Sequence, residues 1–277
     1  MKIKKMLKKS LKFLFVFLVK LCQSLLSVFF IITKTNLRNH IPLIKDAGSL
    51  TILANGPSLK DEIDKLDLTS CELSVLNDFY KSPKFRMLRP KYYVLADPLY
   101  VSDKESINGI TQNLDWEMVL FVPFSFLKKA GPLRDLSCEN VRVIPYNSNT
   151  YQGFECLRNF FYKKGLAMPR AQNVLVASIF TGINMGYKEI NIYGADHSWT
   201  QTLGVNEMNQ VCAIDSHFYD KEKVKYLPYN CMKMHELLRA FAFMFESYHY
   251  LRNYADSIGC RIINCTKGSF IDAFERA

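Results

Sequence analysis

Four short polar stretches have residue types that could bind or transform a ligand, and each follows an apolar, strand-like run. They are Asn55-Gly56, Asn77-Asp78, Asp97-Pro98 and Gly194-Ala195-Asp196-His197. In open α/β sheets, ligands bind outside the carboxyl ends of the strands, where these side chains would meet. Turns also favour Asn, Asp and Gly, so one such stretch alone would indicate only a turn. Four in one chain favour a shared ligand site.

The first of these stretches predicts a phosphate site. Residues 50–60 read LTILANGPSLK, an apolar run followed by a turn and then by helix-compatible residues. Gly56, followed by Pro57, allows a close approach of the backbone, and Ser58 can cap the helix. The N-terminus of a helix attracts phosphate, so we expect a nucleotide here. The alternative is an ordinary turn that binds nothing, because this sequence lacks the specificity of a complete phosphate-binding loop.

Two further segments contain candidate catalytic residues. Asp196 and His197 directly follow a strand-like run, which would place them in the crevice with Trp199 as a stacking surface. In the alternative, Asp196 caps the next segment and His197 is a solvated turn residue. The second segment, residues 215–219, reads DSHFY. A histidine titrates near neutral pH, so His217 suits a general base that accepts a hydroxyl proton.

Tyrosines near this histidine could serve the leaving group. Tyr219, Tyr226 and Tyr229 could hydrogen-bond a departing phosphate, or they could pack within their own segment. A Mg²⁺ ion held by Asp97 and Asp196 against a triphosphate is a further alternative. No D-x-D triplet follows a strand-like run, however, so we expect no metal ion and no other cofactor.

The elements that would position these residues alternate along the chain. Apolar runs predict strands at 50–54, 73–77, 92–96, 118–122, 141–145, 189–193 and 261–265. Helices are clearest at 171–185 and 232–257, and each is followed by a glycine suited to end a helix. This alternation predicts an α/β fold with a mostly parallel sheet covered on both faces. Ser269, in the loop after the last strand, could complete the nucleotide pocket.

The segment 198–230 departs from this pattern, because it is polar and aromatic with little periodicity. More than thirty such residues inside a compact domain indicate a functional lid over the site. The eight cysteines form no C-x-x-C pair, so they indicate reduced cytosolic thiols rather than a zinc site or a disulfide framework.

The positive charge is concentrated at the N-terminus. Residues 1–45 contain ten of the 36 Lys and Arg residues and no Asp or Glu, so the other 26 basic residues balance the 26 acidic ones. A nucleic-acid-binding body would need its own basic face, and we therefore expect no nucleic-acid partner.

The N-terminal segment has the pattern of a basic amphipathic helix. Residues 13–33 are mostly apolar, and one helical stripe opposite the Phe, Leu and Val residues contains Lys5, Lys9, Lys12, Lys20, Gln23 and Ser27. We expect residues 1–45 to bind an anionic membrane surface and residues 46–277 to form the catalytic body. A spanning helix, opposed by Lys20, and a helix that binds a partner or the core remain alternatives. A signal peptide is disfavoured, since no small-residue cleavage site follows. The expected location is peripheral, on the cytoplasmic face of the bacterial inner membrane.

Five motifs also occur in a recognisable order: LANGPSLK at 53–60, LNDFY at 76–80, ADPLY at 96–100, GYKEINIYGAD at 186–196 and CTKGS at 265–269. This order resembles small bacterial sialyltransferases of glycosyltransferase family 42. The similarity covers about residues 50–275, nearly the whole body. The same pattern extends to the flagellin-modifying motility-factor proteins and to 6-hydroxymethylpterin diphosphokinase-like proteins.

The resemblance implies a Rossmann-like variant of the GT-A fold that binds a CMP-activated acidic sugar without a metal. His217 would activate the acceptor hydroxyl, and Gln172 and Asn173 lie near a Thr-Ser pair of the family. Asp97 stands where the family has Asn, and Ser198 stands where a tyrosine is expected, which leaves a metal or a different donor open. The expected donor-binding residues are Asn55, Gly56, Pro57, Ser58, Asn77, Asp78, Asp97, Gln172, Asn173, Gly194 and Ser269. The expected catalytic residues are His217, His197, Asp196 and Tyr219.

Three functions fit these observations. The first is a membrane-associated glycosyltransferase in surface polysaccharide or lipopolysaccharide synthesis, with a nucleotide-sugar donor and a glycan or lipid-linked acceptor. The donor would be a CMP-linked nonulosonate or a Kdo-type sugar. The second is a Mg²⁺-dependent pyrophosphokinase-like enzyme that acts on a small alcohol, and the third is a membrane-tethered scaffold without activity. The basic N-terminus favours the first, because it would hold an enzyme where lipid-linked acceptors lie.

Overall fold

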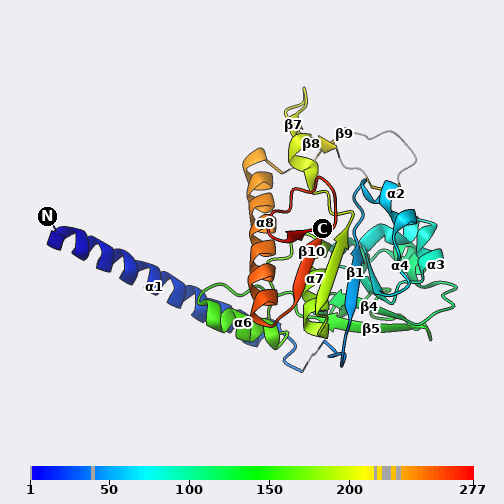
Figure 1. Ribbon diagram of the computed structural model, residues 1–277, viewed down its shortest axis with the longest axis horizontal. Coiled ribbons are helices and arrows are strands. Elements are labelled where there is room, and N and C mark those ends of the chain that lie inside the picture. The colour runs from blue at the N-terminus through cyan, green and yellow to red at the C-terminus, as the bar shows by residue number, and fades with distance from the viewer. Residues whose placement is uncertain (1, 39–40, 215–216, 220–225, 229–231) are drawn as a thin grey trace.

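A single parallel sheet forms the centre of the protein. The computed structural model describes residues 2–38, 41–214, 217–219, 226–228 and 232–277. The eight strands lie in the order β11-β10-β6-β1-β2-β3-β4-β5, and every neighbouring pair is parallel (Figure 1). They are β1 (Ser49–Leu53), β2 (Glu72–Leu76), β3 (Tyr92–Val94), β4 (Met118–Pro123), β5 (Val141–Tyr146), β6 (Glu189–Tyr193), β10 (Arg261–Asn264) and β11 (Glu275–Arg276). The Rossmann-like α/β fold is thus confirmed, with all seven predicted strands present.

Alternation along the strands divides the core between the two faces of the sheet. Leu50 and Ile52 of β1 pack with one core cluster, whereas Leu53 packs with the other. The helices follow the same division: α6, α7 and α8 contribute to the first cluster, and α2 and α4 contribute to the second. The helices are α2 (Leu59–Glu62), α3 (Lys84–Leu88), α4 (Lys104–Thr111), α5 (Phe124–Leu127), α6 (Glu155–Lys163), α7 (Val174–Met185) and α8 (Met234–Ser257).

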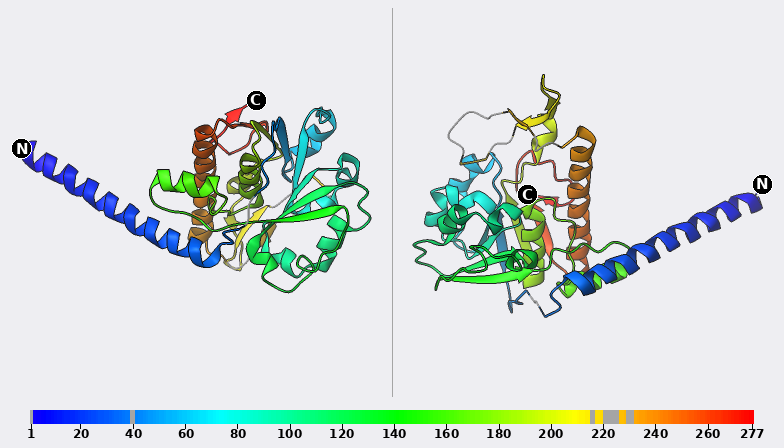
Figure 2. Two further views of the ribbon diagram at one scale, coloured as in Figure 1. Left: turned by 90° about the horizontal axis from the view of Figure 1, so that it is seen from below. Right: turned by 180° about the vertical axis from the view of Figure 1, so that it is seen from behind.

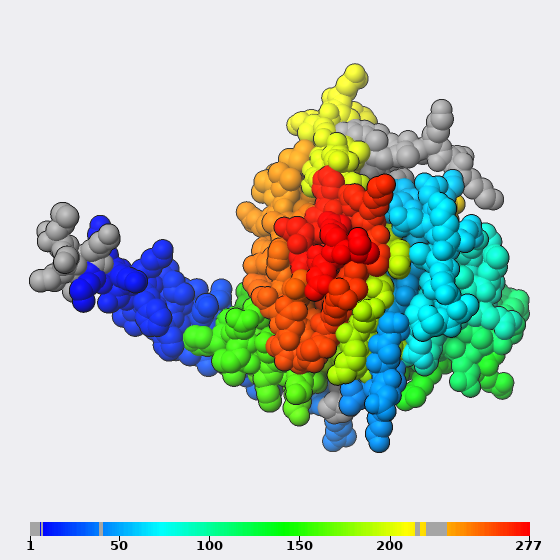
Figure 3. All heavy atoms as spheres, in the orientation of Figure 1, coloured from blue at the N-terminus to red at the C-terminus, as the bar shows by residue number. Residues whose placement is uncertain are grey.

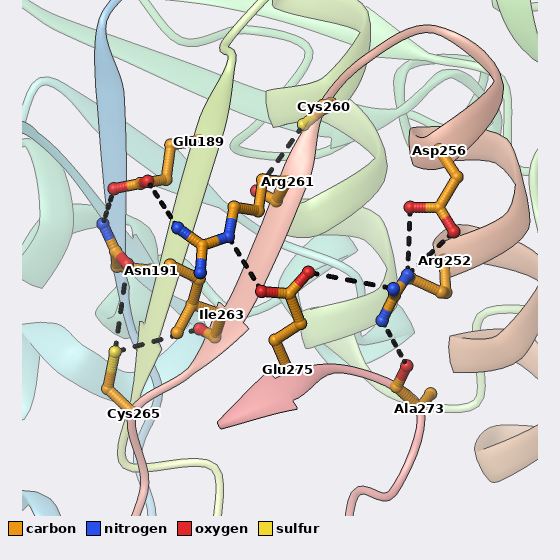
Figure 4. A network of polar contacts seen from close by, with 10 residues as sticks. All are labelled: Glu189, Asn191, Arg252, Asp256, Cys260, Arg261, Ile263, Cys265, Ala273 and Glu275. Atoms are coloured by element: carbon orange, nitrogen blue, oxygen red, sulfur yellow. Dashed lines mark hydrogen bonds and ion pairs between the residues drawn. The ribbon is translucent and has the colours of Figure 1, made fainter. Parts of the chain in front are cut away.

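Polar side chains fix the edge of the sheet that carries the short strand β11. Arg261 of β10 pairs with Glu275 of β11 at 2.8 Å and with Glu189 of β6 at 3.7 Å. Arg252 of α8 reaches the same Glu275 at 3.8 Å, so one carboxylate joins strand and helix (Figure 4). The network is exposed to solvent, where ion pairs contribute little stability, and it tethers the C-terminal segment against α8 and β10.

The expected lid segment contains a second, three-stranded antiparallel sheet. Its strands are β7 (Gly204–Val205), β8 (Val211–Ile214) and β9 (Tyr226–Pro228), in the order β7-β8-β9. Figure 1 shows this small sheet at the same end of the central sheet as α2. The segment therefore lies at the carboxyl ends of the parallel strands, as a lid would.

The N-terminal helix α1 (Lys2–Lys34) is one long helix whose two halves have different surroundings. Its first half projects from the body, and its second half lies against it (Figures 2 and 3). Ser24 and Ser27 are buried there, and Ile31 belongs to the first core cluster. The chain division expected at residue 45 stays a prediction, but a cut at that point would remove Ile31 from the core.

Candidate functional site

A cleft of about 590 Å³ opens at the carboxyl ends of β1, β2, β3 and β6. The chain runs from β1 to β5 on one side of the sheet and returns to β6 on the other side of β1. Ligands bind at this kind of topological switch point in open parallel sheets. The cleft therefore lies where the polar strand ends predicted a site.

Backbone contacts join the loops that follow β1 and β6. Gly56 donates its N–H to the carbonyl of Gly194 at 2.8 Å. A Cβ atom at Gly56 would stand 2.0 Å from Oδ2 of Asp196 and 2.4 Å from the Gly194 oxygen. Only glycine fits there, as predicted for a close backbone approach, but what approaches is the protein's own chain.

The carboxylate of Asp196 occupies the start of α2. Ser58 donates its hydroxyl to Asp196 Oδ2 at 2.8 Å, and its N–H points to the same oxygen at 3.4 Å. Ser58 makes no capping bond of its own, so that expectation was wrong. Burial and the nearby Asp196 carboxylate both raise the pKa of Glu62, at the other end of this short helix. The phosphate site expected at α2 is thus filled by an internal anion.

Two asparagine amides face the cleft in fixed orientations. Asn55 donates Nδ2 to the carbonyl of Leu76 at 3.1 Å, which leaves its Oδ1 with no partner among the described residues. Asn77 accepts the N–H of Ala96 on Oδ1 at 3.3 Å, so its Nδ2 is the donor that remains. A carbonyl must face a donor and an N–H must face an acceptor, which fixes both amide assignments. Asn55 Oδ1 is thus a buried acceptor, and Asn77 Nδ2 is the donor that the pair leaves for a ligand.

Helix α7 begins at the cleft, and Asn173 is its N-cap. Asn173 Oδ1 accepts the N–H of Val176 at 3.2 Å, and the first helical residues, Val174 and Leu175, line the cleft. The N-terminal N–H groups of a helix and its dipole favour an anion. The start of α2 is occupied by Asp196, whereas the start of α7 lines the cleft.

Asn173 also determines which ring nitrogen of His197 carries the proton. Because Asn173 Oδ1 caps α7, its Nδ2 must face His197 Nε2 at 3.0 Å, and Tyr248 OH lies 2.6 Å from the same nitrogen. An amide N–H only donates, so Nε2 carries no proton and the neutral ring is protonated on Nδ1. Burial lowers the pKa of His197 to about 3. His197 is therefore a neutral group at pH 7, and the alternative of a solvated turn residue is excluded, since the side chain is only 6% exposed.

His217 approaches the cleft from the lid segment. Its ring stacks on Tyr219 with centroids 5.2 Å apart, and the adjacent Phe218 packs on Phe79 at 5.2 Å. Phe218 also donates its N–H to the carbonyl of Asn55 at 3.1 Å. The described part of this segment is thus held at the end of β1, with His217 lining the cleft. Asp215 and Tyr229, and the side chain of Tyr226, lie outside the described residues.

Carboxylates dominate the wall that follows β2 and β3. Asp97 accepts the N–H of Leu99 at 2.9 Å, and Asp103 accepts both the hydroxyl and the N–H of Ser106, which lowers the pKa of Asp103. Asp78 pairs with Lys81 at 2.7 Å and accepts a hydrogen bond from Tyr100 at 2.6 Å. Together with Asp196, the described lining carries four carboxylates and one cation, Lys81.

Most of the expected site residues meet in this cleft, and three do not line it. Ser58 is turned to Asp196, and Tyr219 lies behind His217. Ser269 is buried, where its hydroxyl donates to the carbonyl of Ala195 at 2.5 Å and accepts from Asn264. Ser269 therefore supports the loop after β6 rather than completing the pocket. The expected residues that line the cleft are Asn55, Gly56, Pro57, Asn77, Asp78, Asp97, Gln172, Asn173, Gly194, Asp196, His197 and His217.

Sequence reasoning missed several groups. The lining also contains Lys81, Leu99, Tyr100, Asp103 and Ser106. An Asp directly before a helix-compatible run is a helix-start pattern, and it could have placed Asp103 at the end of the loop after β3. Tyr248, on α8, gave no signal, because an aromatic residue in a long helix usually indicates core packing.

No group of three or more potential metal ligands occurs among the residues for which a placement is given. Asp97 and Asp196 nevertheless both line the cleft, so the expectation of no metal stays a prediction and Mg²⁺ stays the alternative.

Comparisons with known proteins found no matching family model and no matching curated protein. Among solved structures, the chain is similar to a MAf glycosyltransferase from Magnetospirillum magneticum AMB-1, with 13% sequence identity and a TM-score of 0.49. The alignment covers 86% of this chain and 35% of that protein, so this chain spans about a third of its length. The cleft itself is therefore the basis for a proposed function.

Proposed function

We propose that this protein is a membrane-associated glycosyltransferase. It would transfer a sugar from a nucleotide-activated donor, such as a CMP-linked nonulosonate or Kdo-type sugar, to a glycan or lipid-linked acceptor in surface polysaccharide or lipopolysaccharide synthesis. The observation that carries the proposal is one cleft in which a helix N-terminus, two fixed amides and a histidine from the lid segment converge. These are the groups that a phosphate, a nucleoside and an acceptor hydroxyl respectively require.

The donor phosphate is assigned to the N-terminus of α7. The start of α2 is filled by Asp196, whereas Val174 and Leu175 of α7 line the cleft. A leaving phosphate gains negative charge as the glycosidic bond breaks, so a helix N-terminus stabilises it more in the transition state than in the ground state.

His217 is assigned as the general base. It lines the cleft from the lid segment, and Val174 and Leu175, which are assigned to the phosphate, line the same cleft. In the proposed step, His217 accepts the proton of an acceptor hydroxyl while that oxygen bonds to the anomeric carbon and the phosphate leaves. His197 cannot take this role at neutral pH, since its Nε2 lone pair already accepts hydrogen bonds and its pKa is about 3.

The first test is nucleotide binding by the full chain, because the core includes Ile31 of α1. Thermal unfolding with CMP, CDP, UDP, GDP and ATP, each with and without Mg²⁺, compares the candidates. A ligand at 100 times its Kd stabilises the folded state by about 2.7 kcal/mol. A shift with CMP alone supports the proposal. A shift that requires ATP and Mg²⁺ would select the pyrophosphokinase-like alternative, which the aspartates of the cleft favour, and no shift would select the scaffold.

Two pairs of variants localise the result. Asn55 and Asn140 both donate Nδ2 to a backbone carbonyl, but only Asn55 lines the cleft. We expect Asn55→Ala to lose the shift and Asn140→Ala to keep it. For transfer, His217→Ala should reduce the rate by about 10²–10⁴-fold while nucleotide binding persists. His235→Ala, at an exposed position of α8, is the control. Normal turnover by His217→Ala would refute the assigned base.

A further inference from the structure

The exposed side of α1 carries a continuous apolar stripe. At about 100° per residue, seven exposed apolar residues fall within roughly 80° of one another around the helix. They are Leu11, Leu14, Leu18, Leu21, Leu25, Phe29 and Ile32. The stripe runs from Leu11 to Ile32, including the half of the helix that lies against the body. Leu25 and Phe29 are 63% and 58% exposed, although they sit beside residues that are buried in the body.

The body covers a different side of the same helix. Ser24 Oγ accepts the hydroxyl of Tyr151 at 2.8 Å and the N–H of Phe154 at 3.2 Å. Ser27 exchanges two hydrogen bonds with the backbone of Gln152, and a Cβ at Gly153 would stand 2.0 Å from Ser24 Oγ. The helix is therefore fitted to the body along Ser24 and Ser27, and the stripe faces away from this contact.

We propose that α1 lies in the plane of an anionic lipid bilayer, with its stripe in the acyl region and the body on the aqueous side. This inference rests on the membrane association of the proposed function and specifies the orientation of α1 relative to the bilayer. An interfacial helix needs an apolar face and an opposite polar, cationic face. Lys9 and Lys20 lie opposite the stripe, on the side of the helix that meets the body farther along, and Lys12 lies between that side and the stripe. All three lysines are exposed.

A spanning arrangement is opposed by the length of the undocked helix. By composition, Lys8–Lys34 is long enough to cross a membrane. Crossing requires about 20 apolar residues. The charge-free stretch ahead of Lys20, residues 13–19, rises only about 10 Å. The remainder would have to come from the docked half, which would draw the polar loop on Ser24 and the charged start of α6 into hydrocarbon.

The alternative is that α1 of a second copy of this chain packs on the stripe, because the stripe has the spacing of a coiled-coil seam. Charge repulsion opposes this alternative. Residues 1–45 contain ten Lys and Arg residues and no acidic residue, so two such helices would bring like charges together without compensation. Each lysine near an anionic surface is instead attracted to it.

Depth measurements on the full chain test the orientation. Tryptophan is introduced singly at Leu14, Leu18 and Leu25, and its fluorescence is quenched by lipids brominated at shallow or deep chain positions. We expect similar, shallow quenching at all three positions in mixed phosphatidylcholine and phosphatidylglycerol vesicles. Met87→Trp, an exposed position on α3, should not be quenched. Deep quenching at the middle position with shallow quenching at the ends would show a spanning helix and overturn the proposal.

Charge variants test the partner. Lys9→Gln with Lys12→Gln should weaken binding to the anionic vesicles roughly 30-fold. Lys60→Gln with Lys104→Gln removes the same charge from exposed positions of the body and should change binding little. A stable dimer in solution that ignores vesicles would assign the stripe to a second copy. If the full chain bound CMP but no vesicles, this inference and the membrane association would be contradicted, and the transferase assignment would not. If the full chain bound vesicles but no nucleotide, the transferase assignment would be contradicted instead.

Discussion

The two walls of the cleft are built in opposite ways. On the wall after β1 and β6, the groups hold one another: Asp196 contacts Ser58, Gly56 contacts Gly194, and Asn173 contacts His197. On the wall after β2 and β3, Asp97 and Asp103 serve their own turns through Leu99 and Ser106. Asp78 is the exception there, because it accepts a hydrogen bond from Tyr100 of the neighbouring loop. Substitutions on the first wall should therefore disturb structure, and substitutions on the second should mainly change charge.

The largest structural effect is expected at Gly56, on the first wall. Gly56→Ala would place a Cβ 2.0 Å from the Asp196 carboxylate and 2.4 Å from a backbone carbonyl. Neither neighbour is free to move, because Asp196 accepts a hydrogen bond from Ser58 and the Gly194 carbonyl accepts one from Gly56 itself. We expect a loss of about 3 kcal/mol in the free energy of unfolding, measured by urea titration. Gly48→Ala is the control, since nothing lies within 4 Å of its added atom. Equal stability of the two variants would show that the junction yields easily.

The next effect concerns His197 and acid. Its pKa is depressed by burial from 6.5 to about 3, so between these values the unfolded chain binds a proton that the folded chain does not. The stability contributed by the neutral ring is complete above pH 6.5 and is lost as the pH falls. The loss should be about 1.4 kcal/mol per pH unit, or about 2 kcal/mol by pH 5.

His197→Asn isolates this contribution. His197 has a positive φ of 54°, which asparagine tolerates better than most residues. Urea titrations from pH 7 to pH 5 should show a steeper loss of stability in the parent protein than in His197→Asn. His235→Asn, at an exposed position, should keep the parent's slope. Parallel curves for the parent and His197→Asn would mean that the folded protein accommodates the charged ring.

On the first wall, the sequence predicted where the site residues lie better than it predicted what they contact. The polar strand ends correctly predicted that Asn55, Gly56, Asp196 and His197 would meet, because parallel strands bring their carboxyl ends to one edge. The α2 phosphate site failed because a residue far along the chain, Asp196, fills it. Long-range pairing of this kind leaves no local signal, and neither did the bonds that Asn173 and Tyr248 make to His197.

The second wall should respond through charge. Asp97→Asn keeps a capping oxygen for Leu99 and removes one of four carboxylates from the described lining. We expect a metal-independent nucleotide to bind about fivefold more tightly, measured calorimetrically, because a phosphate would face less repulsion. The gain should shrink at high salt. Asp115→Asn, at an exposed ion pair with Arg89, is the control. Weaker binding in the presence of Mg²⁺ would instead identify Asp97 as a metal ligand.

The smallest effect on stability is expected at Asp103, on the second wall. Its carboxylate caps α4 through the N–H and hydroxyl of Ser106. Asp103→Ala should reduce stability by about 1 kcal/mol, whereas Asp103→Asn, which can still cap, should cost only a few tenths. The depressed pKa of Asp103 also predicts a pH dependence. The stability contributed by its carboxylate is present above the unfolded pKa and is lost as the pH falls through the lower folded value. A loss as large as that of Gly56→Ala would show that the second wall is as interdependent as the first.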